Sequence, residues 1–180
     1  MSLTPVLLGL GSNVQREPHL HAGLDALAEL LVNMRCSPVF ESLAVGYKGD
    51  NFYNLVVAGD TELPLTVLDR RLKFIEADNG RYAPDRKGLP LDVDVLLYDE
   101  LVGNFHGLLL PRAEILKNAF VLWPLALLAP ALKHPAVGEC FSDLWAHSSI
   151  DQQLWPVSFQ WRGMELTPAE LIGQHPPRSP

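Results

Sequence analysis

Two aspartates, Asp92 and Asp94, stand two positions apart in the apolar stretch LDVDVLLY, which is typical of a β-strand. Because alternate side chains of a strand project from the same face, we expect the two carboxylates to lie side by side. Neighbouring carboxylates repel each other unless a cation lies between them, and carboxylates completed by waters and phosphate oxygens are a common way of holding Mg²⁺. The spacing therefore predicts either a magnesium site or a half-solvated strand that turns both aspartates towards water.

Positive charge gathers just before these aspartates. Six of the 14 Lys and Arg residues lie between Arg70 and Lys87, although the formal net charge of the chain is −7. We interpret the first three of the six as part of a solvated helix face, whereas Arg81, Arg86 and Lys87 fall in a predicted loop. Local cations in an otherwise acidic protein favour a small polyanion over a nucleic acid as the ligand.

The bulk composition indicates a packed protein. A chain of 180 residues with 48% hydrophobic and 19% charged residues can form a core and is not expected to be disordered. No apolar run approaches the roughly 18 residues of a membrane helix and no signal peptide is recognised, so we expect a cytoplasmic protein without membrane or nucleic-acid partners. Cys36 and Cys140 lack metal-ligand spacing and are interpreted as buried free thiols, with a disulfide as the alternative. The oligomeric state stays open, with a monomer favoured.

The elements that would position the aspartates and cations alternate between strands and helices. An apolar run at Val6–Leu10 is typical of a buried strand, and leucines spaced three or four apart predict a helix over 20–31. Two β-rich segments, 34–45 and 52–58, flank a predicted loop at 46–51. The first half of the chain therefore reads as strand, helix, strand and strand.

The second half continues with a helix and a strand. Pro64 suits the first turn of a helix that would end near Asn79–Gly80, and the aspartate strand follows. Further along, the patterns predict a buried helix at 120–129, a short helix at 141–147 and an extra strand at Trp155–Trp161.

This order predicts a ferredoxin-like α+β fold. The sheet would be antiparallel, with the strands in split βαβ order, helices packed on it and a C-terminal extension of helix and strand. We expect residues 1–146 to form the domain and residues 147–180 to pack on it or trail from it. Folds of this kind host many functions, so the function must be argued from the site.

Five stretches, taken together and in order, carry a resemblance to a known family. They are LGLGSN (8–13), FYNLVV (52–57), IEADNGR (75–81), LDVDVLLYD (91–99) and LPRAEILKNAFVLWPLALLAP (110–130). No one of them is specific, but all five in register over residues 5–145 resemble the 6-hydroxymethyl-7,8-dihydropterin pyrophosphokinase family of folate biosynthesis, of which the chain looks like a divergent member. The resemblance implies transfer of the β,γ-pyrophosphoryl group of ATP to the hydroxymethyl oxygen of the dihydropterin.

The resemblance also implies roles for individual residues. Asp92 and Asp94 would bind two Mg²⁺ ions, and Arg81 would brace a phosphate oxygen beside them. The nucleotide contacts that it implies, or that nearby cations would supply, are Glu76, Arg81, Arg86, Lys87, Arg112 and Lys117. The pterin pocket would be lined by Ser42, Val45, Phe52, Asn54 and Phe120.

Three of the pocket residues also have a purely structural interpretation. Asn54 stands in an apolar strand and needs a partner if it is buried, for which a ligand edge and a backbone group are equally suitable. Phe52 and Phe120 could stack on a pterin ring, but aromatic residues by default belong to the core.

The chain departs from the family pattern where nucleotide contacts are expected. The loop APDRKGLP (83–90) is shorter and poorer in arginine than in family members, and it has no tryptophan to close over a pterin. Arg112 stands in place of a histidine, and Asn118 in place of an arginine. These departures leave three hypotheses: an active enzyme with a rearranged ATP clamp, a paralogue acting on another pterin or phosphate donor, and a non-catalytic binding protein. The loops at 46–51 and 81–90 are expected to close over substrates as lids.

Overall fold

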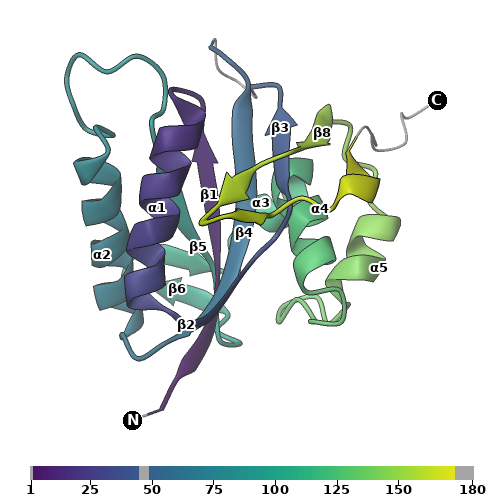
Figure 1. The fold of residues 1–180 in the computed structure, drawn as a ribbon. Coiled ribbons are helices and arrows are strands. Elements are labelled where there is room, and N and C mark those ends of the chain that lie inside the picture. Colours follow the sequence, from purple (N-terminus) through teal and green to yellow (C-terminus); the bar gives the residue numbers. More distant parts are fainter. Residues whose placement is uncertain (1, 45–48, 173–180) are drawn as a thin grey trace.

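The computed structural model of the 180-residue chain describes residues 2–44 and 49–172. Its strand β1 (Thr4–Ser12) lies between β4 (Phe52–Thr61) and the edge strand β5 (Asp92–Tyr98) and is antiparallel to both (Figure 1). The apolar run from which the sequence predicted the first strand is the middle of β1. The two aspartates lie on β5 and are therefore next to β1.

The other strands extend the sheet on the far side of β4. Strands β2 (Val32–Cys36) and β3 (Val39–Ser42) both pair with β4, and β8 (Leu154–Val157) pairs with the outer edge of β3. Between β2 and β3, the Ser37 hydroxyl accepts a hydrogen bond from the Val56 amide of β4 at 2.8 Å, which keeps the interrupted strand attached. Since β2 and β3 together take the place of one strand, the sheet has the ferredoxin-like order, and the predicted fold class is confirmed.

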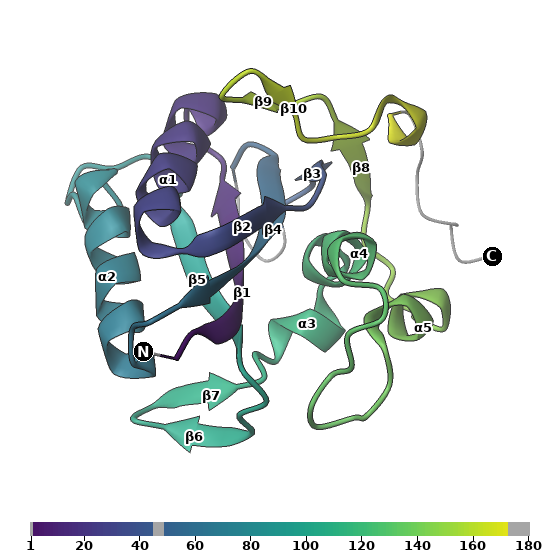
Figure 2. The ribbon, with the colours of Figure 1, turned by 60° about the horizontal axis from the view of Figure 1, so that its bottom comes forward.

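Two helices cover one face of the sheet. Helix α1 (Arg16–Leu30) and helix α2 (Leu65–Asp78) lie side by side there (Figure 2). The apolar stripe of α1, with Leu24 completely buried, packs against alternate β1 residues such as Leu8. Helix α2 begins directly after Pro64, as the sequence predicted.

Three shorter helices cover the opposite face. They are α3 (Glu114–Lys117), α4 (Ala119–Leu128) and α5 (Phe141–Ala146). The other alternate residues of the strands, such as Leu7, pack against α4 and α5 (Figure 2). Pro124 lies within α4 and is buried, and the helix continues through it. The site lies on this second face, next to α3 and α4.

Two differences from the sequence prediction concern short strands. A hairpin of β6 (Gly103–Phe105) and β7 (Leu108–Leu110) follows the aspartate strand, where no strand was predicted. Its two turn residues, His106 and Gly107, both have positive φ, which is the geometry of a tight two-residue hairpin turn. The predicted strand at 155–161 is divided between β8 and β9.

Beyond β8, the C-terminal extension forms a short hairpin beside α1 and then a single turn of 3₁₀ helix (Figure 2). Strand β9 (Gln160–Trp161) pairs with β10 (Met164–Glu165), and a 3₁₀ turn, η1 (Ala169–Leu171), follows. The indole nitrogen of Trp161 donates to Asp25 of α1 at 3.0 Å.

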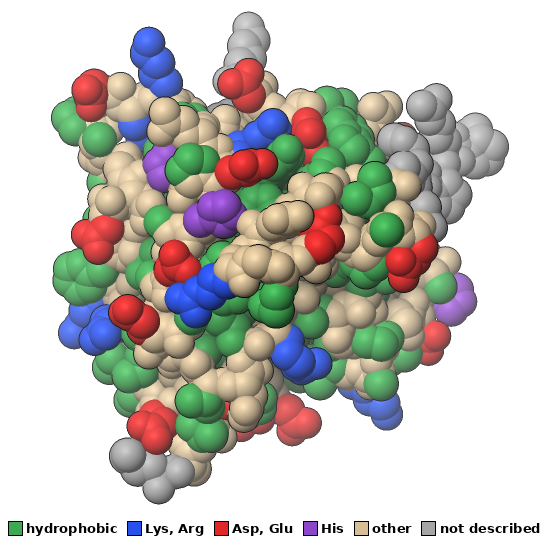
Figure 3. All heavy atoms as spheres, in the orientation of Figure 1, with side chains coloured by type: hydrophobic (Ala, Val, Ile, Leu, Met, Phe, Trp, Pro, Cys, Tyr) green, Lys and Arg blue, Asp and Glu red, His purple; other side chains and the backbone are tan. Residues whose placement is uncertain are grey.

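The surface carries charges of both signs, and both cysteines are free. Acidic and basic side chains alternate over the face shown in Figure 3, without one broad field of either sign. Cys36 and Cys140 are free thiols and half-buried, and burial raises the pKa of Cys36 to about 11. None of the helices in the described ranges is long and apolar enough to cross a membrane.

Candidate functional site

The two aspartates lie side by side at the end of the sheet where β1 finishes and β5 begins. Asp94 pairs with Gly9 of β1, and Asp92 pairs with Gly11. Because neither glycine has a side chain, the face of the sheet beside the aspartates is open. The opening is a cavity of about 280 Å³, called here the acidic cavity. Its lining residues include Gly9, Gly11, Asn54, Asp92, Asp94, Arg112, Glu114, Asn118 and Phe120.

A third carboxylate reaches the aspartate pair from α2. Glu76 is buried, and one carboxylate oxygen from each of Glu76, Asp92 and Asp94 lies within 4.8 Å of the others. The Val93 amide donates to Glu76 at 2.9 Å and the Tyr82 hydroxyl donates to it at 2.8 Å, so this carboxylate is held in place. Three converging carboxylates are a donor set that suits a hard divalent cation such as Mg²⁺.

Each aspartate also forms an ion pair with an arginine. Arg81 donates to Asp92 at 2.9 Å and lies 3.4 Å from Glu76, whereas Arg112 lies 3.3 Å from Asp94. The Nε atom of Arg112 is buried and, within the described parts of the chain, makes no hydrogen bond, although a Glu114 oxygen is 3.3 Å away. The cluster is thus flanked by guanidinium groups that offset part of its negative charge.

The protonation of the cluster follows from its burial. Burial, together with the hydrogen bond and the negative charge of Asp92, raises the pKa of Asp94 to about 8, although Arg112 acts to lower it. Burial likewise raises the pKa of Glu76, against the hydrogen bonds from Val93 and Tyr82. The cluster therefore keeps a proton near neutral pH, and a divalent cation would take its place.

A second cavity of about 190 Å³ adjoins the acidic cavity and is called here the aromatic cavity. Its lining is Gly11, Ser42, Leu43, Phe52, Asn54, Leu89, Asp92 and Phe120. Four of these residues also line the acidic cavity, namely Gly11, Asn54, Asp92 and Phe120. A molecule that filled the aromatic cavity would therefore reach the aspartate pair.

The polar group of the aromatic cavity is the amide of Asn54. Its side chain is 7% exposed, and its nitrogen donates to the Ser42 hydroxyl at 2.9 Å. The structural partner is thus another side chain, rather than the backbone group considered from the sequence. A Cβ atom on Gly11 would lie 2.8 Å from the Asn54 oxygen, so glycine is needed at this position for the amide to lie where it does.

The two phenylalanines are half-buried and line the aromatic cavity instead of being enclosed in the core. Leu43 and Leu89 complete the apolar lining, and the sequence analysis named neither as a pocket residue. Gly9 and Gly11 of the LGLGSN stretch were not predicted as site residues either, although a glycine inside a strand often marks a position that a ligand or another backbone approaches closely. Val45 lies outside the described residues.

The two loops expected to act as lids are joined through Asn13, which is 3% exposed. Its side-chain oxygen accepts from the Leu89 amide at 2.6 Å, and its backbone amide donates to the Leu89 oxygen at 3.0 Å. Its side-chain nitrogen donates to the Asp50 oxygen at 3.3 Å. One buried amide thus ties both loops to the end of β1.

Three predicted nucleotide contacts lie apart from this arrangement. Arg86, Lys87 and Lys117 are exposed and are absent from the lining of the acidic and aromatic cavities. Arg86 donates to the Gly88 oxygen of its own loop at 2.9 Å. A role for these three cations in binding a nucleotide stays a prediction.

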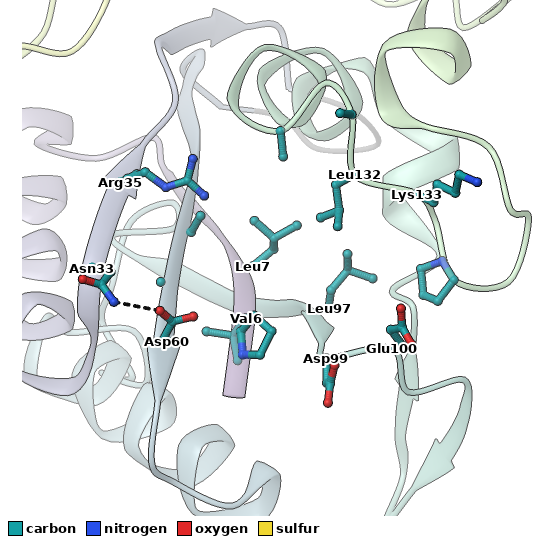
Figure 4. Close-up of a pocket in the computed structure, with 16 residues that line it drawn as sticks. Val6, Leu7, Asn33, Arg35, Asp60, Leu97, Asp99, Glu100, Leu132 and Lys133 are labelled. Atoms are coloured by element: carbon teal, nitrogen blue, oxygen red, sulfur yellow. Dashed lines mark hydrogen bonds between the residues drawn. The ribbon is translucent and has the colours of Figure 1, made fainter. Parts of the chain in front are cut away.

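A larger cavity of about 620 Å³ lies at the opposite end of the sheet, where β1 begins and β5 ends (Figure 4). Leu7, Leu97 and Leu132 form its apolar centre, and Asn33 donates to Asp60 at its edge at 3.0 Å. None of the predicted site residues lines it. This cavity has the greater volume, but the carboxylates, guanidinium groups and aromatic side chains of the candidate site lie at the acidic and aromatic cavities.

Comparison with known proteins identifies the family of the chain. Residues 7–130 match the family model described as 7,8-dihydro-6-hydroxymethylpterin-pyrophosphokinase. The 2-amino-4-hydroxy-6-hydroxymethyldihydropteridine pyrophosphokinase of Aquifex aeolicus is 33% identical over 136 residues, which cover 74% of this chain and 85% of that protein. The protein of the same name from Pseudomonas aeruginosa is 38% identical over 136 residues, which cover 72% of this chain and 83% of that protein.

Solved structures share the fold at lower identity. A Plasmodium falciparum HPPK-DHPS triple mutant with pteroate superposes with a TM-score of 0.64 at 15% identity, covering 81% of this chain and 43% of that one. The wild-type protein with pterin and p-hydroxybenzoate gives a TM-score of 0.63 at 14% identity, covering 81% and 42%. This chain thus spans less than half the length of those chains, and the likeness concerns the fold.

Proposed function

This chain belongs to the 7,8-dihydro-6-hydroxymethylpterin-pyrophosphokinase family, and we propose that the cluster of Asp92, Asp94 and Glu76 is the centre of its reaction. It is an ATP-dependent pyrophosphokinase that transfers pyrophosphate from ATP to the hydroxymethyl group of 6-hydroxymethyl-7,8-dihydropterin in folate biosynthesis. The alternative of a paralogue with another substrate is not favoured, because the curated relatives carry the name of this one activity.

Asp92 and Asp94 would hold Mg²⁺, and the resemblance implies two ions. The convergence of three carboxylate oxygens within 4.8 Å supports this proposal. The raised pKa of Asp94, which burial and the negative charge of Asp92 cause, is consistent with a place for a cation. A bound Mg²⁺ supplies charge that orients the triphosphate and offsets the negative charge of the transferred group. Glu76 keeps Asp92 and Asp94 in place by fixing the start of β5 through the Val93 amide.

Arg81 and Arg112 would bind the triphosphate. Their guanidinium groups already lie at the carboxylates, 2.9 Å from Asp92 and 3.3 Å from Asp94, at the edge where phosphate oxygens would approach. With a cation bound to the carboxylates, the two guanidinium groups would be less strongly attracted to them. Each guanidinium presents several N–H donors in one plane, which is the geometry that binds a phosphate group. Arg112 therefore supplies a positive charge where family members have a histidine, which supports an active enzyme with a rearranged clamp.

The pterin would lie in the aromatic cavity. Asn54 offers a fixed amide to the polar edge of the ring, with its nitrogen already shared with Ser42, while Phe52 and Phe120 offer aromatic faces. Leu89 adds an apolar side chain to the lining of this cavity. The ring is thus bound by one polar edge and apolar walls, as is usual for small-molecule pockets.

The observation that carries this proposal is the shared wall of the two cavities. Gly11 and Asp92 line both, so a pterin in one cavity and a triphosphate in the other meet at the aspartate pair. Holding both substrates in this way converts a bimolecular transfer into a reaction within one complex. The loops joined by Asn13 would exclude water from that meeting point.

The direct test is AMP formation with 6-hydroxymethyl-7,8-dihydropterin, ATP and Mg²⁺. We expect AMP that depends on the pterin, and a fall of about 1,000-fold or more in kcat for Asp92→Asn and for Asp94→Asn, because both remove a metal ligand. Asp99→Asn is the matched control, since Asp99 is exposed, follows the same strand and lines the far cavity. No AMP above background from the folded wild-type protein would refute the assignment of the site. Equal activity of the Asp94→Asn and Asp99→Asn variants would refute the metal role.

A further inference from the structure

A short segment of the C-terminal extension, residues 152–154, contacts both walls of the aromatic cavity. The segment lies beyond residues 7–130, the part of the chain that matches the family model. It lines neither the acidic nor the aromatic cavity itself. Figure 2 shows β8, which begins at Leu154, the last residue of this segment, next to β3 and close to α4.

The first wall is the start of α4. The N-cap residue of this helix, Asn118, makes no side-chain capping hydrogen bond, so the first amide of the helix lacks a local acceptor. Gln152 supplies the acceptor: its side-chain oxygen accepts from the Ala119 amide at 2.8 Å. Its side-chain nitrogen donates to the Asn118 oxygen at 3.0 Å. Both functional groups of Gln152 therefore hold the turn that carries Phe120 into the cavity.

The second wall is the end of β3. Leu154 pairs with Ser42, and the Leu43 amide donates to the Gln153 backbone oxygen at 3.3 Å. Leu154 is 1% exposed and packs against Phe40 of β3 and Ala119 of α4. The segment thus joins the strand that carries Ser42 and Leu43 to the helix that carries Phe120.

We propose that Gln152 is a positioning residue for the pterin, which fixes the start of α4 against β3 and thereby sets the width of the aromatic cavity. This inference rests on the proposed function, because it takes the aromatic cavity as the pterin site. A flat ring needs its stacking face and its hydrogen-bonding edge at a fixed separation. Phe120 supplies the face, and Asn54, held by Ser42, supplies the edge. Phe120 lies on α4 and Asn54 on β4. Gln152 holds the start of α4, and the segment to which it belongs pairs with β3, whose Ser42 hydroxyl holds Asn54.

The test compares Gln152→Leu with Gln153→Leu. Both variants make the same change at neighbouring positions. Among the described residues, however, Gln153 makes its hydrogen bond through its backbone oxygen alone, which the substitution leaves in place. For Gln152→Leu we expect the KM for the dihydropterin, and its Kd without nucleotide, to rise about 10-fold, which corresponds to about 1.4 kcal/mol. The KM for ATP and kcat should change by less than about 2-fold. Gln153→Leu should behave as the wild type in all four measurements.

A third variant separates positioning from general integrity of the extension. Thr167→Val removes the hydroxyl that accepts from the Val39 amide at 3.0 Å, a buried contact between the extension and the beginning of β3. We expect it to lower the unfolding temperature without raising the KM for the pterin. The inference is overturned if Gln152→Leu leaves pterin affinity unchanged, or if Thr167→Val weakens it equally. An active wild-type enzyme with an unaffected Gln152→Leu variant overturns this inference alone, whereas an inactive wild type that binds no pterin overturns the proposed function.

Discussion

Gly11→Ala offers a sharp test of the aromatic cavity, because the structure gives the distance at which the new methyl group would meet its neighbour. A Cβ atom on Gly11 would lie 2.8 Å from the side-chain oxygen of Asn54, closer than real Cβ contacts allow. Asn54 is buried, and its side-chain nitrogen donates a hydrogen bond to the Ser42 hydroxyl at 2.9 Å, so its side chain cannot rotate freely away from the new methyl group. The amide must shift by about half an ångström or more, and we expect overpacking of this size to cost about 1–3 kcal/mol of stability.

The same shift moves the amide away from the pterin edge. Loss of one or two well-aligned hydrogen bonds corresponds to about 1–3 kcal/mol of binding, so we expect the Kd for the dihydropterin to rise about 5- to 100-fold. Calorimetric titration of the pterin without nucleotide measures this value directly, and thermal unfolding measures the stability cost. Circular dichroism would establish that the variant is folded.

Gly9→Ala is the matched control on the same strand and the same face. Its Cβ atom would lie 3.4 Å from the flexible Leu96 side chain, which is ordinary contact, so pterin affinity should stay within about 2-fold of the wild type. A second check is a double-mutant cycle with Asn54→Ala, in which the collision with Gly11→Ala is absent. We expect Gly11→Ala to cost little further affinity in that background. Wild-type affinity in Gly11→Ala, or full additivity in the cycle, would refute the reasoning.

Two further predictions concern the aspartate pair and the loops. Because the pKa of Asp94 is raised from 3.8 to about 8 in the folded protein, the folded state binds more protons than the unfolded state between these values, and the stability of the metal-free protein should fall as pH rises from about 4 to 8. Unfolding temperatures across this range should show the fall in the wild type and a flatter profile in Asp94→Asn; identical profiles would count against the raised pKa. Asn13→Ala should release the Leu89 amide, so that hydrogen exchange at Leu89 becomes at least about 10-fold faster while exchange in the middle of β1 is unchanged. Unaltered exchange at Leu89 would show that Asn13 does not hold this loop.

Several features of the fold and the site were readable from the sequence because they depend on local periodicity. Alternation in LDVDVLLY places Asp92 and Asp94 on one face, and the leucine spacing of α1 places its stripe on the sheet. The order of strands and helices then leaves the ferredoxin-like arrangement as the natural outcome. The β6–β7 hairpin was not predicted because its strands are only three residues long. In addition, its first turn residue, His106, has a positive φ, and histidine is not one of the residues that typically form such a turn.

The composition of the site depended on contacts between residues distant in the chain. The register of β1 against β5 places Gly9 and Gly11 opposite the aspartates, and a slip of one residue would have turned them to the other face. Glu76 joins the cluster because α2 ends beside the start of β5, which no local pattern specifies.

The sequence by itself thus determined which side chains share a face of each strand or helix, and with them the carboxylate pair and the fold. Tertiary structure alone decided which faces meet: Arg112 at Asp94 and Gln152 at the start of α4, while Arg86 turned to solvent. The physical reason is that side-chain direction follows from backbone geometry over a few residues. The meeting of two elements depends instead on strand register and on the packing of the whole core.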